Sequence, residues 1–210
     1  MRRSRGARAG VNDDCEILER ETVYRGFFRI ERFRLRHRLY RGGWTTPMER
    51  EVFEREPAVG VLLYDPAADA LVLVEQFRLP PLVAGFPAWQ TEIVAGIVDP
   101  RDGTETDVAR REVREEAGVE IIGDLIPIHR TMPSPGGSSE IVALYCGRVD
   151  SRNAGGYHGL ADEHEDIKVL VQSYDTAMAR VRAGEIVNGP TVLALYWLAA
   201  NRARLRRRWK

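Results

Sequence analysis

The chain has 210 residues, of which 44% are hydrophobic, and its 31 basic residues balance 31 acidic ones. This length and composition favour one substantial core with room for a small extra subdomain. The charge balance argues against a nucleic-acid-binding domain, which is ordinarily strongly basic. Two isolated cysteines, Cys15 and Cys146, argue against a disulfide framework or a zinc site. No long apolar run follows the basic N-terminus, so we expect a cytoplasmic protein without signal peptide or membrane span.

The sequence begins and ends with basic runs. Residues 1–13 are expected to form a disordered basic N-terminus, and residues 205–210 a basic tail. Runs of like charge at chain ends are typically frayed and solvated, whereas a binding arm is the alternative interpretation.

Residues 14–56 alternate between apolar and charged side chains, which favours an antiparallel sheet with one face in water. Glycines at positions 26, 42 and 43 interrupt the alternation and mark turns. Phe27 and Phe28 could pack in the core of such a sheet, or they could contact a ligand. The strands are predicted at 15–24, 27–40 and 48–55.

Residues 57–204 mix short apolar runs with helical patterns. Asn188 followed by Gly189 and Pro190 is typical of a helix start, because proline suits the first turn. Strands with helices placed between and after them indicate an α/β sandwich. The predicted strands are 59–64, 70–77, 92–95, 125–130, 141–149 and 167–171, and the later helices are 175–183 and 190–203.

A further helix is predicted within residues 96–119. Its apolar stripe repeats every four residues, at Ala109, Val113 and Ala117. Thr106 and Asp107 suit the first turn or the cap, and Gly118 is a stop signal. Burial of the stripe leaves the acidic residues of the helix on a neighbouring face.

The acids of this helix are hard to explain by stability. Glu112 and Glu116 are four residues apart and carry like charge, which should cost roughly 0.2–0.5 kcal/mol unless a cation lies between them. Arg111 precedes Glu115 by four residues, the less favourable order for an ion pair. Carboxylates this close suit Mg²⁺ or Mn²⁺, which prefer oxygen ligands and also bind substrate phosphates. The alternative is a solvated helix with charges of both signs.

Residues 96–119 resemble the Nudix box, whose pattern is G-x5-E-x7-R-E-U-x-E-E-x-G-U, with U an aliphatic residue. The second half matches at Arg111, Glu112, Val113, Glu115, Glu116, Gly118 and Val119. The first half departs, because Gly103 occupies the position of the first glutamate and Glu105 is offset by two residues. In the family that glutamate mainly supports the loop and the arginine, so the departure concerns loop geometry more than metal binding.

Segments outside the box narrow the resemblance to bacterial ADP-ribose pyrophosphatases, over about residues 14–200. These segments are 21–28, 49–55, 75–78, 92–96, 134–137 and 158–166. The resemblance implies the Nudix α/β/α sandwich with a mixed sheet, preceded by the small N-terminal antiparallel sheet. It also implies a homodimer in which that sheet reaches the partner's site. The substrate would be a nucleoside diphosphate sugar, with neither nucleic acid nor membrane as a partner.

The resemblance also assigns roles to individual residues. The ligands of Mg²⁺, for which Mn²⁺ could substitute, would be the Ala95 carbonyl, Glu112, Glu116 and Glu165. Glu163 would be the general base on a mobile loop, Glu115 a further ligand or water-positioning carboxylate, and Arg111 a support for the glutamates. The implied substrate contacts are Phe27, Phe28, Arg50, Glu51, Arg55, Arg78, Ile97, Ser134, Pro135, Gly136 and Glu140.

The loop at residues 153–166 is rich in glycine and acidic residues, and we call it the acidic loop. It fits this arrangement, because a loop of this kind could move over a metal site. Taken alone, such a loop is also typical of solvated surface. The expected reaction is attack of water on phosphorus, which yields AMP and ribose 5-phosphate from ADP-ribose. Hydrolysis of another nucleoside diphosphate sugar, such as GDP-mannose, is the nearest alternative. A sensor that binds a nucleotide sugar without cleaving it is a further one, and the retained acids argue against it.

Overall fold

The computed structural model describes residues 13–99, 101 and 103–209, except for the side chain of Glu163. The chain divides into two compact units. The first unit comprises Met1–Arg55 with Ser134–Ser139, and the second comprises Glu56–Pro133 with Glu140–Lys210. The expected disordered segment 1–13 lies outside the described residues except for Asp13.

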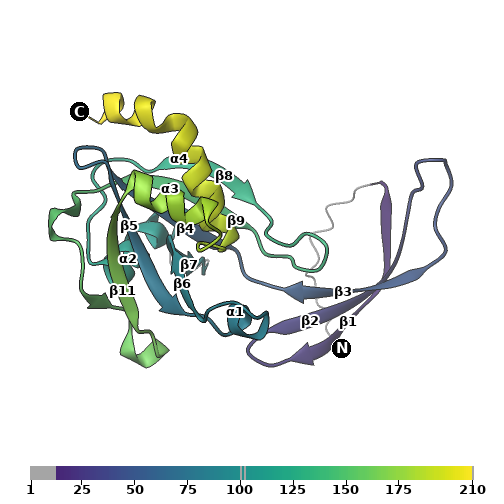
Figure 1. Cartoon of the computed structure of the whole chain (residues 1–210). Helices are drawn as coiled ribbons and strands as arrows, with labels where there is room; N and C mark the ends of the chain where they lie inside the picture. The colour runs from purple at the N-terminus through teal and green to yellow at the C-terminus, as the bar shows by residue number, and fades with distance from the viewer. Residues whose placement is uncertain (1–12, 100, 102, 210) are drawn as a thin grey trace. The chain divides into compact units, whose positions relative to one another are not determined.

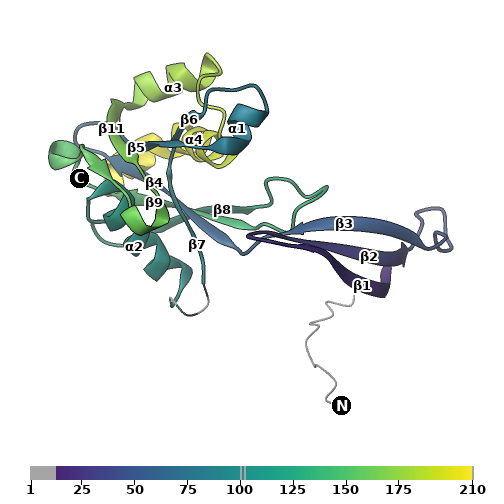
Figure 2. The same ribbon diagram turned by 90° about the horizontal axis from the view of Figure 1, so that it is seen from below.

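The first unit is built on an antiparallel sheet in the order β1-β2-β3, as the alternation in residues 14–56 predicts (Figure 2). Its strands are β1 (Cys15–Arg25), β2 (Arg29–His37) and β3 (Met48–Glu54). Ion pairs join neighbouring strands, for example Arg34 with Glu19 at 2.8 Å. Exposed pairs of this kind contribute only about 0.2–1 kcal/mol each, so they favour the observed register more than they stabilise the sheet.

The segment Ser134–Ser139 pairs with the end of β3, which the sequence does not predict. The Phe53 N–H donates to the Gly137 carbonyl at 2.8 Å, and the Ser139 N–H donates to the Phe53 carbonyl at 3.1 Å. The Ser139 hydroxyl also accepts a hydrogen bond from the Arg55 N–H at 2.9 Å. A turn from far along the chain is therefore part of the first unit.

The second unit contains a mixed sheet in the order β10-β11-β5-β4-β9-β8, with β6 beside β5 and β7 beside β4. Strand β4 (Ala58–Asp65) runs parallel to β9 and antiparallel to β5 and β7. The mixed sheet that the Nudix resemblance implies is thus confirmed. The other strands are β5 (Ala70–Phe77), β6 (Trp89–Glu92), β7 (Val94–Ile97), β8 (Ile126–Thr131), β9 (Val142–Arg148), β10 (Tyr157–His158) and β11 (Ile167–Ser173).

Alternate residues of β4 face different helices. Leu62 and Tyr64 belong to the core cluster that contains residues of α3 (Tyr174–Arg182) and α4 (Gly189–Arg208). Val61 and Leu63 belong to the cluster that contains residues of α2 (Glu105–Ala117). Because successive side chains of a strand point to opposite faces, the sheet lies between α2 and the pair formed by α3 and α4 (Figure 1). The predicted α/β/α sandwich is confirmed.

Helix α4 continues past its predicted end at residue 203 to Arg208, so residues 205–208 of the expected basic tail are helical. Leu205 is fully buried, and the Trp209 ring packs near that of Tyr64 with 6.5 Å between centroids. The basic residues at 206–208 lie in the last helical turn, where positive charge interacts favourably with the helix dipole. Apolar contacts beneath the basic run therefore extend the helix.

A tight turn joins β4 to β5, and α4 contributes to holding it. Asp69 has a left-handed backbone with φ of 54°, a conformation that Asp tolerates better than most residues. Its carboxylate accepts hydrogen bonds from the Tyr64 hydroxyl and the Arg202 Nε, both at 2.7 Å. The Arg202 guanidinium in turn lies over the Tyr174 ring, 4.1 Å from its centroid.

The sequence predicts a single strand at 92–95, where the structure has β6 and β7 paired with different neighbours. It does not predict α1 (Leu79–Val83), because five residues are too few to show a helical period. The short helices η1 (Ser151–Asn153) and η2 (Ala161–Glu163) and strand β10, of two or three residues each, are likewise too short to show any pattern in the sequence. Among the described helices, none is long and apolar enough to span a membrane.

Candidate active site

Helix α2 begins and ends where its sequence provides caps. The Thr104 hydroxyl accepts from the Asp107 N–H at 3.2 Å, and the Asp107 carboxylate accepts from the Thr104 N–H at 2.8 Å, which forms a capping box. Gly118 adopts the left-handed conformation at φ 63° and ends the helix, as predicted. Thr106 and Asp107 lie in the first turn, as expected, but the N-cap itself is Thr104.

The buried face of α2 carries one of its acids. Val113 and Ala117 lie in the core as predicted, and Glu116 is only 3% exposed. The Ala95 N–H of β7 donates to Glu116 Oε2 at 3.1 Å. Within the described part of the chain, no ion pair joins Glu116 to a cation. A buried carboxylate without such a partner is costly to keep charged.

The charge state of Glu116 reflects this environment. Burial raises the pKa of Glu116 from its ordinary value of 4.5 to about 8. The Ala95 N–H and the charge of Arg78 act to lower this pKa, whereas the charges of Glu112 and Glu165 raise it further. These charged groups of α2, the acidic loop and the end of β5 therefore lie within electrostatic range of one another.

The backbone of β7 approaches Glu112 closely. A Cβ atom at position 96 would lie 2.2 Å from the carboxyl carbon of Glu112, so Gly96 is needed for this approach. Ala95 precedes Gly96 in β7 and contacts Glu116. The strand thus brings its backbone against both acids of the like-charge pair.

Arg111 contacts two of the helix acids. Its Nη2 lies 2.9 Å from Glu112 Oε1, and its Nη1 donates to Glu115 Oε2 at 2.8 Å. Arg111 therefore lies between the carboxylates of Glu112 and Glu115. Because Arg111 is on the same helix as both acids, it can fix their side-chain rotamers without help from another element.

The departure in the first half of the box has a structural reason. Gly103 has φ of 95°, a conformation that strains any other residue, and a Cβ there would lie 2.9 Å from Asp107 Oδ2. Glu105 faces other partners, because it accepts a hydrogen bond from the Tyr145 hydroxyl at 2.9 Å and pairs with Arg130. Glu105 thus stabilises the start of α2 against β8 and β9.

The acidic loop is anchored to the end of α2. The Gly159 N–H donates to the Glu115 carbonyl at 3.2 Å. A Cβ at Gly118 would lie 2.3 Å from the His158 ring, which shows how closely that ring packs on the helix end. Glu165 is half-buried, and its Oε2 accepts from the Leu160 N–H at 3.2 Å. Glu163 ends η2, and its side chain lies outside the described part of the structure.

Arg78, expected at phosphate, follows β5 directly and is half-buried. Its Nη2 and Nε donate to Glu92 Oε2 at 2.9 and 3.2 Å. Burial lowers the pKa of Arg78, but Glu92, followed by Glu116 and Glu165, outweighs burial and raises it. Glu92 is not predicted from the sequence as a site residue, because a single acid at the end of a strand carries no spacing signal.

The donor set fits a hard divalent cation in its chemistry. The buried carboxyl group of Glu116 is within electrostatic range of the carboxylates of Glu112 and Glu165. Carboxylate oxygens are the ligands that Mg²⁺ and Mn²⁺ prefer. In the residues that the structure describes, no three His, Cys, Asp or Glu side chains are gathered closely enough to hold a metal ion as they stand. The Glu163 side chain is outside that set.

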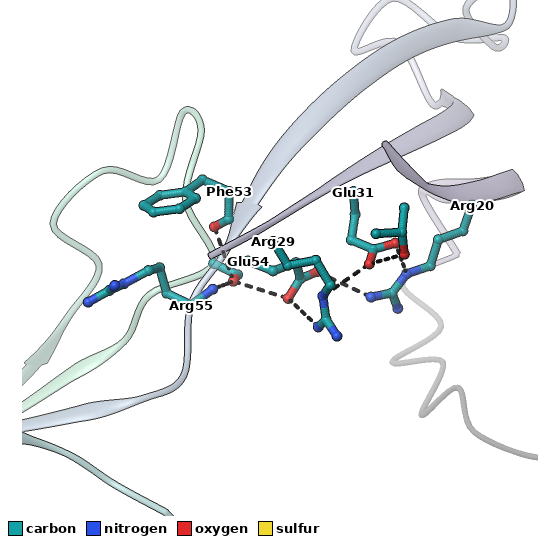
Figure 3. Close-up of polar contacts among 8 residues, drawn as sticks. Arg20, Arg29, Glu31, Phe53, Glu54 and Arg55 are labelled. Atoms are coloured by element: carbon teal, nitrogen blue, oxygen red, sulfur yellow. Dashed lines mark hydrogen bonds and ion pairs between the residues drawn. The ribbon is translucent and has the colours of Figure 1, made fainter. Parts of the chain in front are cut away.

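In the first unit, aromatic rings and a cation form a small cluster at the ends of β2 and β3. Phe27 is 89% exposed, so it is not strand core, and Phe28 is 40% exposed. The Phe28 ring stacks edge-to-face with Phe53 at 4.9 Å and with Phe27 at 4.8 Å. The Arg55 guanidinium lies 4.7 Å from the centroid of Phe28. Figure 3 shows Phe53, Glu54 and Arg55 in succession on the chain here.

The other expected substrate contacts are placed as follows. Arg50 Nη1 donates to the Glu49 carbonyl at 2.8 Å, and Glu51 lies 3.3 Å from Arg32, so both are outward residues of β3. Residues 134–137 form a turn, as predicted, in which the Gly137 N–H donates to the Ser134 carbonyl at 3.1 Å. Ser134, Pro135 and Gly136 are therefore in the first unit, whereas Ile97, at the end of β7, and Glu140, before β9, are in the second.

The fold and the acid-bearing helix define a class of protein. Residues 54–188 match the family model of the NUDIX domain. The chain belongs to the Nudix family. An ADP-ribose pyrophosphatase of Shigella flexneri is 43% identical over 197 residues, covering 94% of this chain and 93% of its own. The ADP-ribose pyrophosphatase of Haemophilus influenzae is 41% identical over 202 residues, covering 94% and 91%.

Relatives that are less similar in sequence carry other names. A GDP-mannose pyrophosphatase of Citrobacter koseri is 36% identical over 152 residues, which cover 71% of this chain and 77% of the relative. The crystal structure of an ADP compounds hydrolase superposes with a TM-score of 0.69 at 20% identity, covering 92% of this chain and 97% of that one. This last similarity supports the fold.

Proposed function

We propose that this Nudix enzyme hydrolyses the diphosphate bond of ADP-ribose to AMP and ribose 5-phosphate, and that it requires Mg²⁺, with Mn²⁺ as a substitute. The observation that carries the proposal is the buried Glu116 carboxylate, which lies within range of Glu112 and Glu165 beside a Nudix-box helix. Relatives named ADP-ribose pyrophosphatase match 94% of this chain, and those named GDP-mannose pyrophosphatase match 71%. The longer match favours ADP-ribose over GDP-mannose.

The metal would be held by carboxylates of α2 and the acidic loop together with one backbone carbonyl. The proposed ligands are Glu112, Glu116, Glu165 and the carbonyl of Ala95. When bound, a divalent ion supplies positive charge to diphosphate oxygens and lowers the pKa of a bound water.

The chain's own residues would carry out the rest of the reaction. Water attacks one phosphorus, the bond from that phosphorus to the bridging oxygen breaks, and the other phosphate leaves with that oxygen. Glu163 accepts the proton of the attacking water, and Glu115 positions the water. Arg111 keeps Glu112 and Glu115 in place through the contacts described above. Arg78 binds a phosphate oxygen through its planar guanidinium.

The first unit would supply the nucleoside site. An exposed ring such as Phe27 can stack on adenine, and the Arg55 guanidinium beside Phe28 adds a cation to the same surface. The remaining proposed substrate contacts are Arg50, Glu51, Ser134, Pro135 and Gly136 of the first unit and Ile97 and Glu140 of the second.

A hydrolysis screen tests the substrate. Purified protein with Mg²⁺ is offered ADP-ribose, GDP-mannose, diadenosine substrates and NADH, and the products are separated by chromatography. We expect AMP and ribose 5-phosphate from ADP-ribose at the highest kcat/KM. A higher kcat/KM for GDP-mannose would establish the alternative hydrolase. Tight binding of nucleotide sugars without any product would indicate a sensor.

Two variants of the acidic loop test which of its glutamates is the general base and which is a metal ligand. Glu163→Gln should lower kcat by roughly 10²–10⁴, as expected for a lost general base, with little change in the Mg²⁺ requirement. Glu165→Gln should instead raise the Mg²⁺ concentration for half-maximal rate. If both variants behave as wild type, the loop is solvated surface, and the base is to be sought among Glu115 and Glu140.

We also infer a cytoplasmic homodimer in which the first unit serves the partner's site. Ile17, Tyr24 and Phe27 of the first unit are 60%, 57% and 89% exposed, which is unusual for apolar side chains of a small sheet and favours a covering partner. Sedimentation at micromolar protein should show a dimer. A fully active monomer would contradict this assignment.

A further inference from the structure

Glu92, the last residue of β6, is a buried carboxylate outside the acids of α2 and the acidic loop. It is 5% exposed. Its Oε2 accepts hydrogen bonds from Arg78 Nη2 and Nε and, at 3.4 Å, from Gln76 Nε2. Its Oε1 accepts from Asn188 Nδ2 at 3.1 Å. With both oxygens engaged, the carboxylate is fixed in one orientation.

The strand register explains why these side chains meet. Strands β5 and β6 are antiparallel, with Val74 opposite Glu92 and Gln76 opposite Gln90. Side chains two residues apart share a face of a strand. Gln76 and Glu92 are therefore on one face of the strand pair, and Arg78 continues that series just beyond β5.

The start of α4 supports Glu92 from a second direction. Asn188 is the N-cap of α4, and its Oδ1 accepts from the Thr191 N–H at 3.0 Å, which directs its Nδ2 toward Glu92. The Thr191 hydroxyl also accepts from the Ile93 N–H at 3.0 Å. The cap of α4 thus holds the side chain of Glu92 and the backbone of its neighbour.

Arg78 lies within electrostatic range of acids other than Glu92 with which it could pair. Glu116 and Glu165, which are proposed metal ligands, act on the charge of Arg78 along with Glu92. In the described part of the chain, Glu92 is the acid of these three that contacts the guanidinium directly, through Nε and Nη2. If Glu92 lost its charge, Glu116 and Glu165 would remain as acids that act on Arg78, and these are the acids proposed to bind the metal.

We propose that Glu92 is a positioning residue that orients Arg78 toward the diphosphate and keeps it from pairing with Glu116 and Glu165, with Asn188 supporting it from the start of α4. This inference rests on the proposed function, because it assumes that Arg78 binds phosphate. A residue that acts only through Arg78 should have no effect on catalysis once Arg78 is removed.

A double-mutant cycle tests this dependence. We would measure kcat and KM for ADP-ribose at saturating Mg²⁺ in Arg78→Ala, Glu92→Gln and the double variant. Arg78→Ala should lower kcat/KM by about 10²-fold, and Glu92→Gln by about 10-fold. The double variant should lie within about twofold of Arg78→Ala alone. Calorimetric binding of AMP in the presence of chelator should show the same pattern without turnover.

The outcomes separate the two hypotheses. Unchanged kinetics in Arg78→Ala would overturn the phosphate contact in the proposed function. An effect of Arg78→Ala together with wild-type kinetics in Glu92→Gln, or with fully additive losses in the double variant, would overturn only the positioning role of Glu92. Glu75→Gln is the matched control, because Glu75 is on the opposite face of β5 and lies 3.9 Å from Lys168. Its kcat/KM should stay within about twofold of wild type.

A second variant covers the case in which Glu92→Gln does not fold. Asn188→Asp keeps a good helix cap but replaces the amide donor with a carboxylate facing Glu92. It should retain wild-type circular dichroism and lower kcat/KM by about threefold to tenfold, again with no further loss in the Arg78→Ala background. An unchanged kcat/KM in Asn188→Asp would contradict the supporting role of α4.

Discussion

Glu31 in the first unit and Glu116 in the second are both 3% exposed, yet their carboxylates are held in opposite ways. Glu31 accepts from the Thr22 hydroxyl at 2.7 Å and from Arg20 Nε at 3.1 Å, and it lies 3.0 Å from Arg29 Nε (Figure 3). These partners, led by the Thr22 hydrogen bond, lower the pKa of Glu31. Burial instead raises the pKa of Glu116 to about 8.

The difference teaches how to distinguish a structural acid from a functional one. Glu31 has counter-charges on β1, at Arg20, and on its own strand β2, at Arg29, so its anionic form stabilises the sheet. Glu116 has a backbone N–H, the charge of Arg78 and two acidic neighbours within range, and its pKa is still raised, so an added positive charge would favour its anionic form. The two side chains are equally little exposed to solvent, yet the pKa shifts of their carboxyl groups have opposite directions because their partners differ.

The largest expected effect is on turnover. Glu116→Gln or Glu112→Gln should lower kcat for ADP-ribose by at least about 10²-fold, because each removes a proposed metal ligand, while circular dichroism stays unchanged. Glu31→Gln should keep kcat within a few fold, because Glu31 is proposed only as a structural acid. Full activity of the Glu112 or Glu116 variant, or of wild type in excess chelator, would contradict the metal assignment.

The next effect is on the stability of the metal-free protein as the pH changes. Because the folded pKa of Glu116 is raised from 4.5 to about 8, the folded state binds this proton more tightly than the unfolded state. The contribution of Glu116 is thus most favourable below about pH 4.5 and declines as pH rises to about 8, by on the order of a few kcal/mol. Urea unfolding in chelator at pH 6 and pH 9 measures this decline, which Glu116→Gln should largely remove. An equal decline in that variant would assign it to other groups.

The smallest effect concerns Glu31, whose pKa shift has the opposite sign. Its stabilisation is present above its unfolded pKa of about 4.5 and is lost as pH falls through the lower folded value. Glu31→Gln should lower Tm by a few degrees at pH 7, and by less at pH 3. Glu51→Gln, which removes an exposed pair with Arg32, is the control and should change Tm little. A Tm loss independent of pH would mean that packing, not charge, explains the role of Glu31.

The sequence alone predicts much of the second unit, because its signals are local. The apolar stripe through Val113 identifies the face of α2 that is buried, and the spacing of Glu112 and Glu116 predicts two acids whose charges act on each other. The central strands are predicted to within a few residues because β4 and β5 are continuous apolar runs.

What the sequence does not predict depends on contacts between distant segments. Glu92 gains its partners from β5 and from a helix cap 96 residues away, so no local pattern marks it. Similarly, the pairing of Gly137 with Phe53 joins segments of the first unit that no periodicity connects. The end of α4 is missed because a basic run hides the buried Leu205.

The Asp69 turn has a consequence for the order in which the protein can fold during synthesis. Its ionic partner Arg202 lies 133 residues farther along the chain. During synthesis the β4–β5 turn therefore leaves the ribosome long before Arg202 does. The hairpin must first form while the Asp69 carboxylate is still exposed to water. Closure of the second unit around Tyr64 and Asp69 is expected to be a late event, since contacts across so long a loop form slowly.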